Sequence, residues 1–482
     1  MSRARRRPTP RETWAVILAA GEGKRMRSDR PKILHLLGGQ PLIRYPVALL
    51  REARIAGTVI VVAPGAEAVR TVLADLGASF VEQPEPRGTG DALRRARPAV
   101  PETATEVLLL YADVPLLGRE TLGALLARHR SGRAAATVLT FVPADPTGYG
   151  RVRRGRDGRI RAIVEERDAT PPERRGRECN SGIYCFDPRR LWPALEAVAR
   201  HAPANAQGEV YLTDVIGQLA RRGRRVEAVR VTDPLEVAGV NDRRQLAALE
   251  GRLRSRTLAA LMAAGVTVVD PAVTYVDTTV TVGRDTVLHP GVRLTGRTVI
   301  GEGCVIGTGC QLTDMVLDER IILLPYCVLA GSRVEADATL GPFARLRPGT
   351  RVGQRAEIGN FIELKKATVG RGVKAHHVGY IGDATVGEDA NIGAGTVTCN
   401  YDGVRKHQTR IGARAFVGTN ASLVAPLSIG DDAYVGAGSV ITKDVPPGAL
   451  AVERAPQSVK EGWTERRRSR PKPENGPVDR AP

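Results

Sequence analysis

Residues 340–364 read LGPFARLRPGTRVGQRAEIGNFIEL, and an aliphatic residue returns at every sixth position of this stretch. A period of six residues is typical of a parallel β-helix, in which one aliphatic side chain of each short strand points inward. Gly or Asn then serves the corners, where the backbone angle φ can be positive. Chance spacing in a β-sandwich is the alternative, but the period recurs in three phased runs. The aliphatic positions of these runs are Leu340, Leu346, Val352, Ile358 and Leu364, then Val386 and Ile392, then Ile411, Val417, Leu423, Ile429 and Val435.

The hexapeptide pattern extends outward from these runs, from about residue 268 to residue 452. Residues 399–410 (CNYDGVRKHQTR) interrupt it and contain the turn pair Asp402-Gly403, which predicts a loop that leaves the coil. Loops that project from a rigid solenoid often carry function. Residues 241–264, rich in Leu, Ala and Arg, precede the pattern and predict a helical arm that ends at Gly265.

Residues 13–230 follow a different pattern. Short apolar runs at residues 14–20, 57–63, 106–111 and 135–142 alternate with amphipathic stretches such as residues 41–56 and 66–76. Alternating strands and helices predict a mostly parallel sheet in an α/β domain, which binds ligands at the carboxyl ends of its strands. The predicted organisation is a basic disordered head over residues 1–12, an α/β domain over 13–240, a helical arm over 241–265, a β-helix over 266–454 and a C-terminal segment over 455–482, disordered from about residue 465.

The 482 residues carry a net charge of +19, from 71 basic and 52 acidic residues. Binding to nucleic acid or to a membrane surface is one interpretation of this charge. Arg-rich terminal segments and phosphate-bearing substrates are the other, and we favour it because the chain has no RNA-recognition or zinc-finger signature. No apolar run approaches the roughly 18–20 residues that span a bilayer, which excludes an integral membrane protein.

The six cysteines are scattered and form no C-x-x-C pair. This usage predicts buried free thiols in a reducing compartment. The apolar run after the basic head is too short for a signal peptide and leads directly into a Gly-rich loop with further Arg and Lys. We therefore expect a cytoplasmic protein.

The first candidate site follows the first predicted strand, where residues 18–26 read LAAGEGKRM. Gly21 and Gly23 let the backbone approach a phosphate closely, and the loop amides can form an anion nest. The third glycine of a dinucleotide-binding motif is missing and there is no P-loop, so a plain strand-to-helix turn is the alternative. Asp113 ends another predicted buried strand and suits Mg²⁺ shared with substrate phosphates, unless it is an ordinary turn residue or helix cap.

The second candidate site lies on the predicted β-helix. With three hexapeptides per coil, a step of one coil leads from Arg347 to Lys365 on the same edge, so the two should stack and form a phosphate site. A solvated basic edge is the alternative. His376 and His377 are adjacent, and histidine titrates in the range that suits a general base, although a lone histidine is more often structural. A metal site with His407 as the nearest further ligand fits the surrounding motifs poorly.

The first half resembles the nucleotidyltransferases that make sugar nucleotides. The motifs that carry the resemblance, in order, are LAAGEGKRM (18–26), SDRPKILH (28–35), GTGDA (88–92), YADVPL (111–116), GYGRV (148–152), IVEERDAT (163–170) and CNSGIY (179–184). Taken with the hexapeptide half, residues 13–463 resemble the bifunctional N-acetylglucosamine-1-phosphate uridylyltransferase / glucosamine-1-phosphate N-acetyltransferase family of bacteria.

The resemblance implies an α/β Rossmann-like nucleotidyltransferase domain followed by a left-handed parallel β-helix. It implies that the second half acetylates glucosamine 1-phosphate with acetyl-CoA, and that the first half transfers UMP from UTP to the product and releases pyrophosphate. The UDP-N-acetylglucosamine formed would serve envelope synthesis. The implied partners are small-molecule substrates and a homotrimer formed through the β-helix, without nucleic acid or membrane. A nucleotidyltransferase whose β-helix is only structural is the alternative.

In the first half, the resemblance implies that Mg²⁺ binds at Asp113 and Asn241. Lys32 and Arg25 would neutralise the UTP phosphates. Gly150, Glu165 and Asn180 would bind the sugar. The residues implied to bind UTP or UDP-N-acetylglucosamine are Leu18, Ala19, Ala20, Gly21, Arg25, Lys32, Gln83, Gly88, Thr89, Tyr111, Asp113, Gly150, Glu165, Asn180 and Asn241.

In the second half, the resemblance implies that His377 is the catalytic base. The residues implied to bind glucosamine 1-phosphate are Arg347, Lys365, Tyr380 and Asn391. Those implied to orient the substrates near the thioester or to line the acetyl-CoA groove are Ala394, Asn400, Tyr401, Lys406, Thr419, Ala437 and Arg454.

The sequence departs from the family's pattern at five positions. Pro86, Arg87 and Asp91 stand where the family usually has Gln, Leu and His around the glycines of residues 88–90, and Ala112 and Thr419 replace Gly and Ser. Gln83, Gly88 and Thr89 keep the family's residues. The activity is therefore expected, and Pro86, Arg87 and Asp91 fall on the part of the first site that would select the base.

Overall fold

The computed structural model describes residues 12–21, 23–200 and 205–469. The chain divides into two compact units, Met1–Thr281 with Arg293–Thr298 and Val282–Val292 with Val299–Pro482. The first strands of the hexapeptide region therefore group with the α/β domain. The basic head expected over residues 1–12 lies outside the described residues, apart from Glu12.

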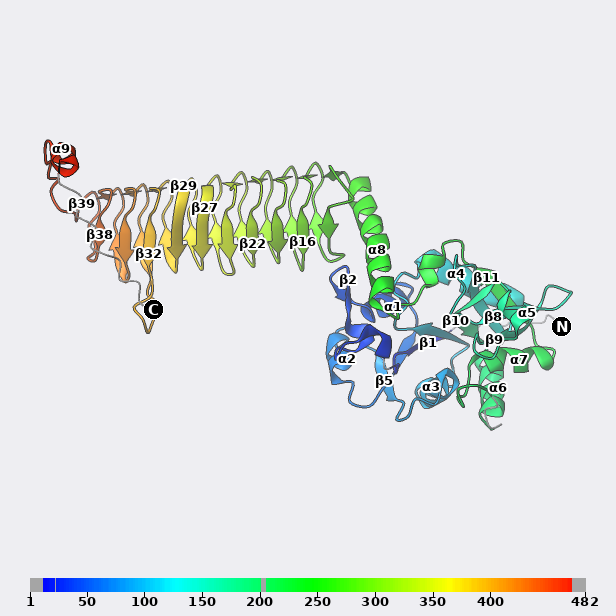
Figure 1. Ribbon diagram of the computed structural model, residues 1–482. Helices are drawn as coiled ribbons and strands as arrows, with labels where there is room; N and C mark the ends of the chain where they lie inside the picture. The colour runs from blue at the N-terminus through cyan, green and yellow to red at the C-terminus, as the bar shows by residue number, and fades with distance from the viewer. Residues whose placement is uncertain (1–11, 22, 201–204, 470–482) are drawn as a thin grey trace, which may run out of the picture. The chain divides into compact units, whose positions relative to one another are not determined.

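A mixed nine-stranded sheet forms the centre of the first unit (Figure 1). Its main path runs β11-β7-β10-β6-β1-β4-β5, in which β10 is antiparallel to both neighbours and all other pairs are parallel. The four predicted strands are confirmed as β1, β4, β6 and β7, so the prediction of a mostly parallel sheet is correct. The strands are β1 (Thr13–Leu18), β4 (Gly57–Val62), β5 (Ser79–Glu82), β6 (Glu106–Tyr111), β7 (Ala136–Phe141), β10 (Cys179–Phe186) and β11 (Val226–Arg230), with β8 (Arg151–Arg154) and β9 (Ile160–Val164) as a hairpin beside β10.

Helices cover both faces of this sheet. Neighbouring residues of a strand point to opposite faces, so each strand contributes to two cores. Ala15 and Ile17 of β1 belong to one core, and Val16 and Leu18 belong to the other. Burial on both faces explains why the predicted strands read as continuous apolar runs. The first core includes residues of α1 (Arg44–Glu52), α2 (Glu67–Val72) and α4 (Arg119–Gly132), and the second includes residues of α3 (Thr89–Ala96), α6 (Pro188–Arg200) and α7 (Thr213–Arg221).

The hexapeptide region forms a parallel β-helix whose coils each contribute three short strands (Figure 1). One coil consists of β24 (Thr339–Leu340), β25 (Arg345–Arg347) and β26 (Arg351–Val352). Leu340 pairs with Ile358 and Leu346 with Leu364 on the next coil, and all four side chains are buried. The six-residue period therefore marks the inward-pointing positions, as predicted. Two series of strands share one sheet from β12 (Thr267–Val268) to β39 (Leu450–Ala451), and the third forms a sheet from β14 (Thr281–Val282) to β36 (Leu427–Ile429).

One coil carries an insertion. The coil that leads from Lys374 to its partner Asn391 has an ordinary length, whereas the next coil, from Asn391 to its partner Phe416, is longer. The additional residues lie between β32 (Val397–Cys399) and β33 (Thr409–Ile411). The prediction that this segment leaves the coil as a loop is therefore confirmed.

Two helices lie outside these two architectures. The stretch predicted to be helical contains α8 (Arg243–Ala263), and the Asp242 side chain caps it by accepting from the amides of Arg244 (2.9 Å) and Gln245 (2.8 Å). The prediction of disorder from about residue 465 is wrong at its start, because α9 (Trp463–Arg468) is helical. Glu465 in its first turn and three arginines in its last turn complement the helix dipole.

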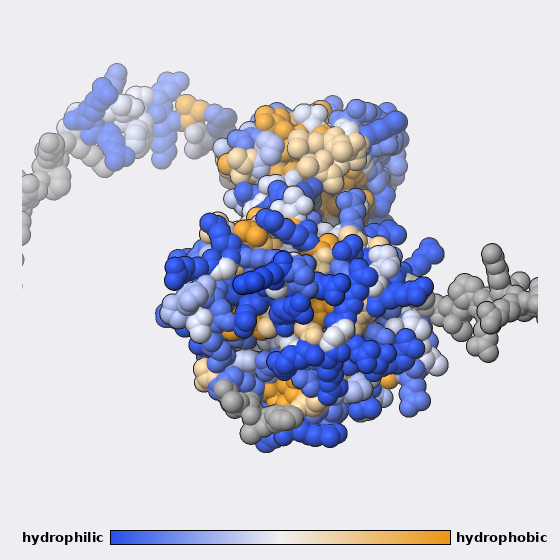
Figure 2. All heavy atoms as spheres, turned by 90° about the vertical axis from the view of Figure 1, so that its right-hand side faces the viewer, coloured by the Kyte–Doolittle hydropathy of each residue, from blue (hydrophilic) through white to orange (hydrophobic). Residues whose placement is uncertain are grey.

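All six cysteines are free; five are buried and Cys399 is half-buried. Among the described residues, no helix has the length and apolar character needed to cross a bilayer. The face of the molecule in Figure 2 is mostly hydrophilic, with small hydrophobic areas between the polar side chains. This surface agrees with the high charge content of the chain.

Candidate active sites

A cavity of about 320 Å³ opens where β1, β5 and β6 end. Its size is typical of sites that bind small molecules, and its place matches the prediction for a parallel α/β sheet. The residues that line it are Leu18, Ala19, Ala20, Gly21, Lys32, Ile33, Gln83, Pro86, Gly88, Thr89, Ala92, Tyr111, Asp113, Glu209 and Asn241. The sequence predicts eleven of these as site residues: Leu18, Ala19, Ala20, Gly21, Lys32, Gln83, Gly88, Thr89, Tyr111, Asp113 and Asn241.

Lys32 lies at the charged end of this cavity. Its Nζ is 2.5 Å from Asp113 Oδ2 and 3.4 Å from Asn241 Oδ1, and all three side chains are at least partly buried. The backbone keeps the two oxygens together, because the Val240 amide donates to the Asp113 carbonyl oxygen (2.9 Å). One positive charge thus already binds both side chains that the sequence predicts as metal ligands.

Gly88 shapes the opposite wall. Its φ is +100°, and a Cβ at this position would lie 2.7 Å from the Val210 carbonyl oxygen. Only glycine therefore allows the segment before α3 to pack this closely on residues 209–212. The Gly90 amide donates to the same carbonyl oxygen (2.8 Å), and the Leu212 amide donates to Thr89 Oγ1 (3.3 Å).

Gly150, Glu165 and Asn180, predicted to bind the sugar, cluster beside the cavity. The Asn180 amide donates to the Gly150 carbonyl oxygen (2.9 Å), and a Cβ on Gly150 would lie 3.4 Å from Glu165 Oε2. Burial raises the pKa of Glu165 although Thr213 Oγ1 donates to its Oε1 (3.0 Å). Burial also raises the pKa of Tyr111, and the charge of the nearby Glu165 adds to that shift. Because Tyr111 lines the cavity, Glu165 and its two neighbours border it.

Arg25 does not line the cavity; it is exposed on the 3-10 helix η1 (Lys24–Met26). The pKa of Asp242 is lowered, mainly by a hydrogen bond from the Gln245 amide, and the charge of Arg25 contributes to the same shift. The lining residues that the sequence did not predict as site residues are Ile33, Pro86, Ala92 and Glu209. Glu209 comes from a segment with no motif of its own, and only its packing against Gly88 brings it to the site.

Basic residues gather on one corner of the β-helix, where Arg347 pairs with Lys365 on the next coil, as the one-coil step predicts. Arg347 Nη1 donates to Glu363 Oε1 (3.0 Å), and Lys365 Nζ lies 3.6 Å from Asp383 Oδ2. Lys406 of the projecting loop lies beside Lys365, whose hydrogen bond and charge lower the pKa of Lys406. Two amines held side by side favour a phosphate as their ligand.

Asn400 connects the projecting loop to this corner. Its Nδ2 donates to Asp383 Oδ2 (2.5 Å) and lies 3.4 Å from the Tyr380 hydroxyl. The loop itself is fixed by Asp402, whose Oδ1 accepts from the Val404 (2.7 Å) and Arg405 (2.6 Å) amides. Tyr401 is 59% exposed, so its ring lies on the surface of the loop.

His377 lies on another column of residues along the β-helix. It pairs with Asn360, and its Nδ1 is 3.0 Å from Asn360 Oδ1. The next coils place Ala394, Thr419 and Ala437 on the same column, since Ile392, Val417 and Val435, two residues before each, are paired. Arg454 joins this column through a hydrogen bond from Nη1 to the Ala437 carbonyl oxygen (2.9 Å). Asn391 lies three residues before Ala394, on β31 (Asn391–Ile392).

The other histidines have different partners. His376 Nε2 lies 2.8 Å from Glu357 Oε2, and His407 Nε2 lies 2.7 Å from Asp402 Oδ2. Within the described part of the chain, no three His, Cys, Asp or Glu side chains are grouped as metal ligands. Of the adjacent pair His376 and His377, only His377 lies on the column of the predicted acetyl-CoA residues.

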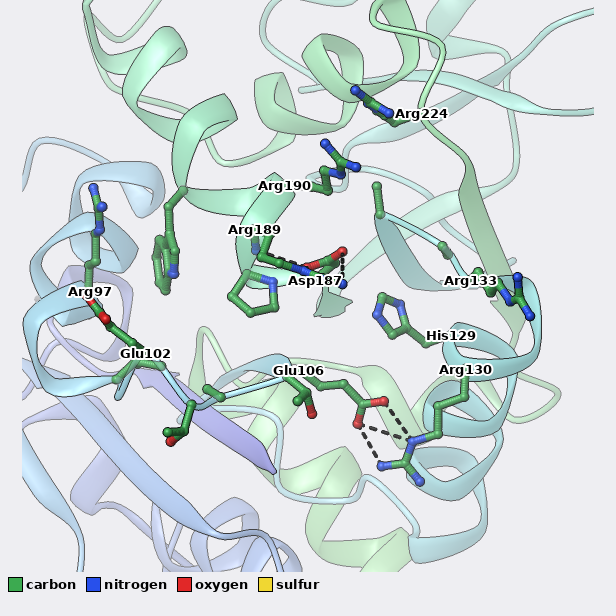
Figure 3. Close-up of a pocket in the computed structure, with 18 of the residues that line it drawn as sticks. Arg97, Glu102, Glu106, His129, Arg130, Arg133, Asp187, Arg189, Arg190 and Arg224 are labelled. Atoms are coloured by element: carbon green, nitrogen blue, oxygen red, sulfur yellow. Dashed lines mark hydrogen bonds and ion pairs between the residues drawn. The ribbon is translucent and has the colours of Figure 1, made fainter. Parts of the chain in front are cut away.

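A larger hollow of about 1380 Å³ lies at the other end of the α/β sheet (Figure 3). Arg130 binds the buried Glu106 on its floor, with Nη2 2.7 Å from Oε2. None of the site residues predicted from the sequence lines this hollow. The arginines that line it are Arg97, Arg130, Arg133, Arg189, Arg190, Arg224 and Arg225.

Comparison with known protein families gives the same division of the chain. Residues 15–213 match the MobA-like NTP transferase domain. Residues 279–314 match the bacterial transferase hexapeptide family, and residues 408–443 match the hexapeptide repeat of succinyl-transferase.

Several curated proteins are similar to nearly the whole chain. The bifunctional protein GlmU of Heliobacterium modesticaldum is 48% identical over 453 residues, which are 94% of this chain and 98% of the relative. The bifunctional protein GlmU of Brevibacillus brevis is 45% identical over 92% of this chain and 95% of its own length. The protein of the same name from an Anaeromyxobacter species is 48% identical over 96% and 94%. The chain therefore belongs to the GlmU family of bifunctional proteins.

Proposed function

We propose that the chain catalyses two reactions of UDP-N-acetylglucosamine synthesis. The β-helix acetylates glucosamine 1-phosphate with acetyl-CoA, and the α/β domain transfers UMP from UTP to the resulting N-acetylglucosamine 1-phosphate. Two chemically distinct sites support this assignment: a cavity with a Lys32–Asp113–Asn241 cluster, and a basic corner with a histidine column. The six free thiols suit the reducing cytoplasm, where both reactions would take place.

In the α/β domain, the chemistry is mainly positioning and charge neutralisation. The phosphate of N-acetylglucosamine 1-phosphate attacks the α-phosphorus of UTP in line, and pyrophosphate leaves. Lys32 neutralises the phosphates, and the Ala20 and Gly21 amides line the same cavity. Gly150, Glu165 and Asn180 hold the sugar beside the cavity.

The residues present fit Mg²⁺. Asp113 and Asn241 offer two side-chain oxygens that already share one cation, and Mg²⁺ prefers oxygen ligands. Gly239 leaves room there, since a Cβ at this position would lie 3.6 Å from Asp113 Oδ2. Bound Mg²⁺ would neutralise charge on the phosphates.

In the β-helix, His377 acts as the general base. With its Nδ1–H donating to Asn360 Oδ1, its Nε2 is left to accept a proton from the attacking amine. Arg347, Lys365 and Lys406 bind the phosphate of glucosamine 1-phosphate, with Tyr380 and Asn400 beside it. The column of Ala394, Thr419 and Ala437 receives acetyl-CoA, and Arg454 lies at its end.

Acetyl transfer takes place between neighbouring copies of the chain in a homotrimer. His377 pairs with Asn360, whereas Tyr380 of the basic corner pairs with Glu363, so one chain holds the base and the phosphate site at different positions along its coils. Tyr326, Phe343 and Phe361 form a ladder of stacked rings, 45–56% exposed, with Phe361 next to Asn360. A second copy would cover this ladder and bring the two parts together.

The observation that carries the proposal is the pairing of a histidine column and a stacked Arg347–Lys365 corner on one β-helix. Two half-reactions test it: release of the CoA thiol with glucosamine 1-phosphate, and release of pyrophosphate from UTP with N-acetylglucosamine 1-phosphate and Mg²⁺. His377→Ala should lower only thiol release, by about 100-fold or more. Asp113→Ala should lower only pyrophosphate release, by about 100-fold.

His376→Ala is the matched control, because the neighbouring histidine is bonded to Glu357 and should leave both rates unchanged. Absence of thiol release in the wild type would make the β-helix a scaffold and favour a single-activity nucleotidyltransferase. Absence of pyrophosphate release with UTP would refute the assignment of the first half.

A further inference from the structure

The Gln83 side chain is buried and its amide nitrogen makes two hydrogen bonds. Nε2 donates to the Gly88 carbonyl oxygen (3.1 Å) and to Asp91 Oδ2 (3.0 Å). Gln83 is 6% exposed and Asp91 is 4% exposed, so the contact between them is shielded from bulk water. Both N–H groups of the amide are used inside the protein.

The remaining atom of the amide, Gln83 Oε1, is open to the cavity. No described residue donates to it, yet it is not one of the fully buried polar atoms that lack a partner. Gln83 lines the cavity that contains Lys32 and Asp113. A ligand in that cavity therefore meets a hydrogen-bond acceptor at this position.

Asp91 decides this orientation. A carboxylate and a carbonyl only accept hydrogen bonds, so exchanging the positions of Nε2 and Oε1 would place Oε1 against two acceptors and lose both bonds. Asp91 lies in the first turn of α3, where the helix dipole favours a carboxylate, and Arg94 (3.7 Å) and Arg95 (3.8 Å) lie near it. Histidine at this position, as is usual in the family, would not fix the amide in the same way, since its nitrogens can donate or accept.

We propose that Asp91 is a positioning residue that sets the base specificity of the cavity by holding Gln83 Oε1 toward the nucleotide. This inference rests on the proposed uridylyl transfer. Uracil presents a ring N–H between two carbonyl oxygens, and it can donate that N–H to Gln83 Oε1. The backbone amides of Ala20 and Gly21, which make no hydrogen bond with another described residue, lie in the same cavity and can serve the uracil oxygens. Cytosine has an acceptor where uracil has the N–H, so it meets Oε1 with the wrong polarity.

The test measures equilibrium binding of UTP and of CTP, each with Mg²⁺, to the full chain. The wild type should prefer UTP, and Asp91→Asn should lose about tenfold of that preference, because its amide allows Gln83 to turn. Asp91→Glu keeps a carboxylate and should retain the preference. Arg97→Gln is the matched control, since it removes an arginine directly after α3 that pairs with Glu196 and not with Asp91.

Selectivity separates positioning from a structural role, since loss of folding lowers the affinity for both nucleotides equally. Asp91→Ser removes the carboxylate with a smaller side chain, and it should show the same loss if Asp91→Asn disturbs folding. If the wild type prefers UTP and the Asp91→Asn and Asp91→Ser variants keep the same ratio of UTP to CTP affinity, the role assigned to Asp91 is wrong. The proposed uridylyl transfer would then still stand. A wild type that binds neither nucleotide would overturn the proposed uridylyl transfer and this inference together.

Discussion

Lysine is rare in this chain, with nine lysines among 71 basic residues, and three of them lie in the candidate sites. Lys32 binds Asp113, Lys365 lies near Asp383, and Lys406 lies beside Lys365. An ammonium is a compact point charge on a flexible stem, whereas a guanidinium is a planar fork. The scarcity of lysine elsewhere therefore points to these positions as ones where a compact charge is required.

Glu165 provides a pH-dependent test at the scale of one residue. Burial raises its pKa above the ordinary value of 4.5, so the folded state holds this proton to higher pH than the unfolded state does. The contribution to stability is fully present below that ordinary value and is lost as the pH rises through the folded-state pKa. Glu165→Gln should therefore be more stable than the wild type at pH 8 and not at pH 4, as measured by urea unfolding at both values.

The same variant should bind N-acetylglucosamine 1-phosphate more weakly, because Glu165 is assigned to the sugar. Thr213→Val is the control for this binding measurement, because it removes the hydrogen bond to Glu165 Oε1 and leaves the carboxylate in place. An equal change in stability at pH 4 and pH 8 for Glu165→Gln would contradict the assigned shift.

Single residues also show what sequence patterns can and cannot predict about the sites. The one-coil step predicts the stacking of Arg347 and Lys365. On the next coil Lys365 pairs with Gly382, and the residue after it, Asp383, is the missed ionic partner of Lys365. The bonds between Gln83 and Asp91 have no such signal. They depend on how α3 packs beside the end of β5, which a sequence pattern does not specify.

At the scale of elements, the β-helix was predictable because its period is read directly from the chain. Most of its strands are very short, yet the inward position repeats often enough to specify the coil. Helix α9 was not predictable in this way. Its residues are almost all charged or polar and have no apolar face, so composition indicated disorder.

Leu323 on β21 (Ile322–Leu323) tests the energetics of one coil. Its side chain is 0% exposed and stacks between Ile306 and Leu340 of the adjoining coils. Leu323→Ala should lower the free energy of unfolding by about 2–5 kcal/mol, because it removes buried methyl groups and leaves a cavity. Ile322→Ala, at a 42% exposed position on the same strand, is the control and should change it by about 0.5 kcal/mol or less. Equal losses of unfolding free energy in the two variants would contradict the assignment of Leu323 to the buried interior of the coil.

At the scale of the whole molecule, the ladder of exposed rings is a surface that a single chain leaves uncovered. Tyr326, Phe343 and Phe361 stack with centroids 5.4 and 5.1 Å apart and with nearly parallel planes. Contiguous exposed apolar side chains commonly mark a protein–protein interface. Phe361 follows Asn360, the coil partner of His377, so assembly and acetyl transfer should depend on each other.

Phe361→Glu places a charge in this ladder and should convert the proposed trimer into monomers, measured by light scattering. Thiol release should fall with the trimer, while pyrophosphate release from UTP should persist, because the α/β cavity is complete within one chain. Val299→Glu changes an exposed residue of the other β-helix sheet and should leave the trimer intact. A Phe361→Glu protein that stays trimeric would exclude the ladder as the interface.

The nearly constant length of the coils also limits which insertions and deletions this half of the chain can accept. An in-frame insertion or deletion that matches one complete coil, such as the step from Leu340 to Ile358, leaves every later residue on its own edge. Neighbouring coils differ by one residue, as from Leu323 to Leu340 and from Leu340 to Ile358, whereas a larger surplus leaves the coil as a loop, as between β32 and β33. Evolution can therefore lengthen this half by whole coils, about 4.8 Å each, or by loops that project from a coil.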